Sequence, residues 1–161
     1  MAERPAVNTS PLVFLSRAGL LDLLRLAGEQ VVIPAAVMEE IDSRGVTDLT
    51  AQAVRQTEWL TIVDTPAIPA QIQAWDLGKG ESSVLAWGHL HAGIEVIIDD
   101  LAARRCAAAM RIPVRGTLGL VLIAKKRAIV LKARPIIDRL RKSGMYLSDR
   151  LANEVLALVD E

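Results

Sequence analysis

The sequence predicts a three-layer α/β domain in which helices cover both faces of a central parallel sheet. Short apolar runs rich in β-branched residues alternate along the chain with longer stretches of helical periodicity. Parallel strands need long crossover connections, usually helices, and their sheets are covered on both faces. With 161 residues, of which 52% are hydrophobic, the chain is long enough to form one such domain over residues 1–161.

The strands are predicted from short apolar runs that stop at polar or turn-forming residues. In chain order they are residues 6–7, 31–33, 59–63, 95–98 and the brief extended piece 112–114. The run 95–98 is the most strand-like, and it ends at two adjacent carboxylates, Asp99 and Asp100.

The helices are predicted from apolar spacing and from residues that begin or end helices. Ser10 is expected to be the N-cap of the first helix, with Pro11 at its first position, and Gly28 ends the second helical piece. Another helix begins after Pro34. The remaining helical segments are residues 49–57, 68–75, 81–93, 102–110, 117–126, 133–142 and 147–159.

The composition excludes several kinds of site. The single cysteine, Cys106, permits neither an intrachain disulfide nor a CxxC metal site, and the only histidines are His89 and His91. A bound metal ion is therefore expected to have oxygen ligands, which favours Mg²⁺ or Mn²⁺ over Zn²⁺. The sequence has no P-loop and no Ser/His/Asp grouping for covalent catalysis.

Nothing in the sequence predicts a membrane segment. No run reaches the roughly 18 uninterrupted apolar residues of a membrane span, and no cationic stretch precedes a long apolar run at the N-terminus. We expect a cytoplasmic protein.

The charge is unevenly distributed although the net charge is zero. Residues 101–142 contain twelve basic residues and one acidic residue. This segment is interpreted with equal weight as a phosphate-binding face or as ordinary solvated helix surfaces. Thr117, within it, is expected to be the N-cap of an apolar helix, with contact to a phosphate as the alternative.

Polar side chains are predicted to gather at the carboxyl edge of the sheet, where ligand sites of parallel α/β folds lie. Asn8 follows the first strand, and Asp99 and Asp100 follow the strongest one. Glu81 lies in the first turn of a helix, and Glu40 lies on the helix after Pro34. Such a carboxylate cluster could hold Mg²⁺ or Mn²⁺, activate a water molecule and neutralise charge on a phosphodiester.

Each of these carboxylates also has a structural interpretation. Glu81 could simply favour the helix dipole, and Glu40 could lie on a solvated helix face. Asp99 and Asp100 repel each other, so a cation or a basic neighbour such as Arg104 should relieve that repulsion, or one of them caps the next helix.

Five short motifs occur in order along the chain. They are Val7-Asn8-Thr9-Ser10-Pro11-Leu12, Pro34 with Val37-Met38-Glu39-Glu40-Ile41, Gly80-Glu81-Ser82, Ile97-Ile98-Asp99-Asp100 with Arg104, and Gly116-Thr117-Leu118-Gly119 with Ala124-Lys125. Their order and spacing resemble those of PIN domains, in particular an uncharacterised prokaryotic PIN-like subgroup related to VapC-type toxins. The resemblance extends from about Val7 to the C-terminus.

The resemblance implies a PIN-like α/β/α sandwich and Mg²⁺- or Mn²⁺-dependent endoribonuclease activity on RNA. It also implies a homodimer and, often, a toxin neutralised by a small antitoxin. By motif match, the acidic site comprises Glu40, Glu81 and Asp99, with Asp100 beside them and Asn8 as a further metal ligand. The residues matched to nucleic-acid contacts are Thr9, Ser10, Arg104 and Thr117.

The first motif departs from the family pattern because Asn8 stands where PIN domains have an aspartate. An amide oxygen can ligate a cation but brings no charge, so metal should bind more weakly. The alternative to a ribonuclease is therefore a catalytically weakened PIN-like protein that binds nucleic acid or a protein partner.

Overall fold

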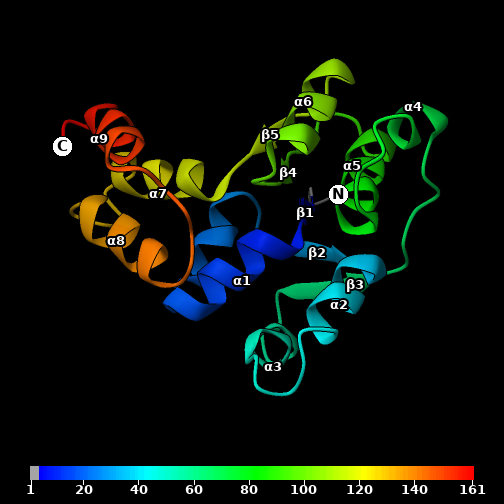
Figure 1. Ribbon diagram of the computed structural model, residues 1–161, viewed down its shortest axis with the longest axis horizontal. Coiled ribbons are helices and arrows are strands. Elements are labelled where there is room, and N and C mark those ends of the chain that lie inside the picture. The colour runs from blue at the N-terminus through cyan, green and yellow to red at the C-terminus, as the bar shows by residue number, and fades with distance from the viewer. Residues whose placement is uncertain (1–3) are drawn as a thin grey trace.

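The computed structural model describes residues 4–161, and its centre is a five-stranded sheet with helices on both faces (Figure 1). The strands are β1 (Ala6–Val7), β2 (Val31–Pro34), β3 (Leu60–Val63), β4 (Val96–Ile97) and β5 (Val114–Arg115). Their order is β3-β2-β1-β4-β5, and every neighbouring pair is parallel. The predicted three-layer α/β fold is confirmed.

The helices connect these strands. They are α1 (Thr9–Ala18), the 3₁₀ helix η1 (Leu21–Leu26), α2 (Ala35–Asp42), α3 (Thr50–Arg55), α4 (Ala70–Gln73), α5 (Lys79–Leu90), α6 (Leu101–Ala109), α7 (Thr117–Lys126), α8 (Arg134–Lys142) and α9 (Asp149–Ala157). Right-handed crossovers place α1, α2 and α3 on the face of the sheet opposite α5 and α6. Helix α5 packs across β1, β2 and β4, and α8 packs on α1 (Figure 1).

The core consists mainly of Leu, Ile, Val and Ala. The three central strands are fully buried, as Val7 of β1, Val32 of β2 and Ile97 of β4 show. Because both faces of these strands are buried, their sequences are continuous apolar runs rather than alternating apolar and polar residues. Within residues 4–161, no helix is long and apolar enough to cross a membrane.

Two predicted helix caps are wrong. Helix α1 begins at Thr9 with Asn8 as its N-cap, so Ser10 lies exposed inside the first turn. Helix α7 has Gly116 as its N-cap, and Thr117 is its first residue. In both places the helix starts directly where a strand ends, and the hydroxyl of Thr117 is used to bind another residue instead of capping its own helix.

Candidate active site

The carboxyl ends of β1 and β4 lie side by side where the direction of the connections reverses. From β1 the chain crosses to β2 on one side, whereas β4 lies on the other side of β1. Val7 is in register with Ile97, so Asn8 and Asp99 emerge at the same edge. Ligands of open α/β sheets bind in the crevice at such a switch point.

Glu40 is held by donors from two other helices. Thr9 Oγ1 donates to Glu40 Oε2 at 2.6 Å, and the backbone N–H of Gly80 donates to Oε1 at 2.9 Å. Thr9 begins α1 and Gly80 lies in the first turn of α5. The solvated-face interpretation of Glu40 is therefore wrong, because its carboxylate joins α1, α2 and α5 at the edge of the sheet.

Asp99 is held by one residue at both oxygens. The N–H of Thr117 donates to Oδ1 and its hydroxyl donates to Oδ2, each at 2.7 Å. Thr117 follows β5, the strand beside β4, and is fully buried. The two hydrogen bonds hold the carboxylate at both oxygens and leave about two of its four acceptor sites free.

A glycine lies against each of the three carboxylates of the site. A Cβ atom on Gly80 would lie 2.7 Å from both oxygens of Glu40, and one on Gly78 would lie 2.6 Å from Glu81 Oε2. A Cβ on Gly116 would lie 3.0 Å from Asp99 Oδ1 and 2.5 Å from Arg104 Nη1. A side chain at any of these three positions would force the neighbouring acidic group or Arg104 to shift.

Two oxygen-bearing side chains at this edge have no hydrogen-bond donor among residues 4–161. Asn8 is only 2% exposed, and its Oδ1 is a buried oxygen without a partner. A buried polar atom left unpaired costs about 1–3 kcal/mol, so an orphaned oxygen of this kind indicates a missing donor or cation. Glu81 is half-buried and accepts no hydrogen bond from the described part of the chain.

Asp100 plays a different part from Asp99. Its Oδ2 accepts a hydrogen bond from Ala103 N at 2.9 Å, so it is the N-cap of α6, which confirms the capping alternative for one of the pair. Arg104 Nη1 donates to the carbonyl of Ile98 at 3.3 Å. Among the described residues no ion pair joins Arg104 to either aspartate, so it does not neutralise them by direct contact.

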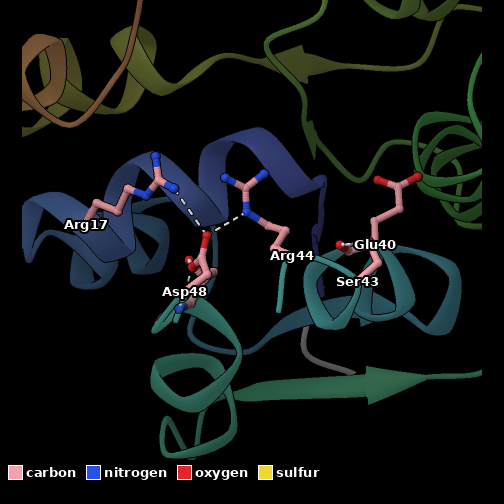
Figure 2. A network of polar contacts seen from close by, with 6 residues as sticks. Arg17, Glu40, Ser43, Arg44 and Asp48 are labelled. Atoms are coloured by element: carbon pink, nitrogen blue, oxygen red, sulfur yellow. Dashed lines mark hydrogen bonds and ion pairs between the residues drawn. The ribbon is translucent and has the colours of Figure 1, made fainter. Parts of the chain in front are cut away.

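The end of α2 that carries Glu40 is tied to α1 through Asp48, whose side chain is 9% exposed (Figure 2). Asp48 Oδ2 accepts from Arg44 at 2.7 Å and from Arg17 at 3.1 Å. Thr50 donates its hydroxyl to Oδ1 at 2.6 Å. These contacts, that of Thr50 first, hold the pKa of Asp48 well below its usual range. Figure 2 shows Glu40 projecting away from this cluster, which positions the helix rather than the chemistry.

In residues 4–161, no three carboxylate, imidazole or thiol groups stand close enough together for one metal ion to bind them all as they are placed. The donor set nevertheless fits a hard cation. Glu40 and Asp99 each accept two hydrogen bonds, and an ionised carboxylate has about four acceptor sites. Together with the free Asn8 oxygen and Glu81, these groups offer only oxygen ligands, the type that Mg²⁺ and Mn²⁺ prefer.

The parallel sheet, with polar side chains at its switch point, defines an open α/β protein of the class whose ligands bind at the carboxyl edge of the sheet. The sequence model of the PIN-domain family matches residues 5–161, and the chain belongs to that family. PIN domains generally use divalent metals and act on nucleic acid, so this membership suggests a nuclease. A comparison with curated proteins finds no match.

Sequence reasoning missed the close contacts that shape the site. The motif match includes Gly80 but not Gly78, although a glycine at the N-cap and another in the first turn of the helix that carries Glu81 are a usable signal. The pairing of Thr117 with Asp99 spans 18 residues and depends on the neighbouring positions of β4 and β5. No local sequence pattern predicts this pairing.

Proposed function

We propose that the protein is a Mg²⁺- or Mn²⁺-dependent endoribonuclease whose site comprises Asn8, Glu40, Glu81 and Asp99. The observation that carries the proposal is the buried Asn8 Oδ1, which has no donor and lies at the strand edge that Asp99 shares. A cation at this edge would give that oxygen a partner and would be attracted by the negative charge of the nearby carboxylates.

The residues of the site divide the work. A divalent cation bound here supplies an activated water and neutralises charge on the phosphodiester. Thr9 and the Gly80 N–H orient Glu40, and Thr117 orients Asp99, while each carboxylate retains acceptor sites for a cation. Arg104 and exposed Ser10 are proposed to contact substrate phosphates, because a guanidinium and a hydroxyl both donate to phosphate oxygens.

The proposal assigns Asp99 rather than Asp100 as the direct ligand. Asp100 is exposed and its carboxylate is engaged with the N–H of Ala103 at the start of α6. An asparagine at position 100 would still cap the helix, since Asn is among the best N-cap residues. We therefore expect Asp100→Asn to retain activity and Asp99→Asn to lose it.

The biological setting is part of the proposal. The motif resemblance to VapC-related proteins supports a toxin that is neutralised by a small antitoxin and acts as a homodimer in the cytoplasm. Expression of the chain alone should then arrest growth, and co-expression of a small reading frame adjacent to its gene should restore it. Normal growth at high expression of active protein would contradict the toxin assignment.

A second candidate function is nucleic-acid binding without turnover, and Asn8 is the observation that favours it. With an amide in place of a carboxylate, the site has about one negative charge fewer and holds a cation less tightly. That protein would bind RNA in a salt-dependent manner without cleaving it.

Cleavage of a mixed RNA pool in Mn²⁺ or in EDTA separates the two. A matched pair on α2 provides the control, because Glu40 contacts Thr9 and Gly80 whereas its exposed neighbour Glu39 projects to solvent. We expect cleavage only with Mn²⁺, its loss in Glu40→Gln and Asp99→Asn, and its retention in Glu39→Gln. Equal activity of Glu40→Gln and Glu39→Gln would overturn the proposed site.

A further inference from the structure

A groove of about 560 Å³ opens beside Asp99. It runs between the start of α6, the start of α7 and the segment 145–151 that leads into α9. Its volume is within the range of small-molecule sites, about 300–1,000 Å³. Since Asp99 lines this groove, whatever occupies it lies next to the proposed catalytic edge.

The walls of the groove are apolar and aromatic. The chain has one phenylalanine and one tyrosine, and both line this groove: Phe14 from α1 and Tyr146 from the segment before α9. Tyr146 is 93% exposed, so its ring contributes little to the core. Leu101 and Leu151 also line the groove and are exposed. Packing of the core does not explain why an aromatic side chain is exposed at this place.

Two positively charged side chains also belong to the groove. Arg104 and Arg115 both line the groove. Arg115 is paired with Glu95 at 2.7 Å, whereas Arg104 has no acidic partner among residues 4–161. A groove with an uncompensated guanidinium and an exposed ring fits a polyanion that also carries flat apolar groups, which describes a single strand of nucleic acid.

We propose that this groove binds an unpaired nucleobase beside the phosphate at Asp99, with Tyr146 stacking on the base and Arg104 facing the backbone. The inference rests on the proposed function and adds to its site a subsite for one base, formed by the groove that Tyr146 lines. In a duplex the bases are stacked on one another and their faces are closed to an aromatic side chain, so double-stranded RNA lacks the group that the groove recognises.

Binding of labelled oligouridylate to protein carrying Glu81→Gln tests this assignment without cleavage. Stacking of one base is worth about 1–3 kcal/mol, which corresponds to a roughly 5- to 150-fold weaker Kd for Tyr146→Ala. Tyr146→Phe keeps the ring and should bind within about twofold of the parent, since every base presents a π-face. The same oligouridylate annealed to oligoadenylate should bind weakly and be insensitive to the substitution.

Several outcomes would overturn the assignment. Equal binding by Tyr146→Ala and Tyr146→Phe would do so, as would duplex binding as tight as single-strand binding, or no binding of any single strand. A wild-type dimer that becomes monomeric in sedimentation with Tyr146→Ala would assign the groove to a second copy of the chain. Preferential binding of oligodeoxyuridylate would change the sugar but keep the base assignment.

A cleavage assay on the unblocked protein separates this inference from the proposed function. If the groove binds a base, Tyr146→Ala should raise KM and leave kcat near the wild-type value, because the ring does not contact the scissile phosphate. Tyr146-dependent binding without any Mn²⁺-dependent cleavage would refute the proposed nuclease activity but support base binding in the groove. Normal cleavage with unchanged KM in Tyr146→Ala would refute base binding in the groove but leave the proposed nuclease activity standing.

Discussion

Replacing Gly80 by alanine should disable the site while leaving the fold almost intact. The new Cβ would lie 2.7 Å from both carboxylate oxygens of Glu40. Contacts between carbon and oxygen are normally no shorter than about 3.3 Å, so the carboxylate must retreat by roughly 0.6 Å. The 2.9 Å hydrogen bond from the Gly80 N–H would lengthen to about 3.5 Å, beyond the useful range.

The expected magnitudes follow from that displacement. A misplacement of about 1 Å in an active site can cost about 100-fold, so a drop in kcat/KM of roughly 10- to 100-fold is expected. The free energy of unfolding should fall by only about 0.5–2 kcal/mol. Alanine gains up to about 1 kcal/mol over glycine in a helix, and the weakened charged hydrogen bond costs about 1.5–3 kcal/mol.

Gly88→Ala in the same helix is the matched control. Its Cβ would lie 2.6 Å from Ile112 Cγ2 and 2.9 Å from Val96 Cγ1, far from any carboxylate of the site. Overpacking of this kind costs about 1–3 kcal/mol, so this variant should unfold at lower temperature but keep its kcat/KM while folded. RNA cleavage in Mn²⁺ and thermal denaturation of both variants measure the contrast. Wild-type kcat/KM in Gly80→Ala would refute the reasoning.

Three further substitutions or treatments test other parts of the account. Asn8→Asp places a charge at a buried position, so the free energy of unfolding of the metal-free protein should fall by about 1–3 kcal/mol. Mn²⁺ should bind this variant on the order of tenfold more tightly than it binds the wild type. Weaker Mn²⁺ binding by the variant in titration calorimetry would contradict this. Asp48→Asn removes the carboxylate charge that Arg17 and Arg44 share and should lower the free energy of urea unfolding by about 1.5–3 kcal/mol at neutral pH. Because the folded pKa of Asp48 is depressed, its contribution is present above the ordinary value of 3.8 and is lost as the pH falls below it, so wild type and variant should converge in acid; a constant gap down to about pH 2 would argue otherwise. Burial raises the pKa of the Cys106 thiol, so iodoacetamide should label the protein only after unfolding, and rapid labelling of native protein would show that the core is open there.

The sheet could be predicted because buried parallel strands leave a strong local signature. Residues 31–33 and 95–98 are runs rich in β-branched residues. Strand β2 extends one residue beyond the first run, and β4 lies within the second. The carboxyl-edge rule predicts that Asn8 and Asp99 lie at the same edge of the sheet, and the register of β1 and β4 agrees with this. What was predictable is thus the part that depends on strand patterning.

The details of the site could not be predicted because they depend on contacts between distant segments. Thr117 looked like a helix cap, yet its hydroxyl binds Asp99 from the neighbouring strand. The bond from Thr9 to Glu40 and that from Arg17 to Asp48 each join residues 31 positions apart. Side-chain donors of this kind are assigned by tertiary packing, which overrides the local preference of a threonine or an arginine.

Anomalous diffraction from crystals soaked in Mn²⁺ tests the central claim most directly. The account predicts a Mn²⁺ peak at the carboxyl edge of β1 and β4, where Asn8 Oδ1 and a carboxylate oxygen of Asp99 would hold the ion together with Glu40 or Glu81. A peak bound instead at Asp100 or at Asp48, or no peak at this edge in crystals of protein that cleaves RNA with Mn²⁺, would contradict it.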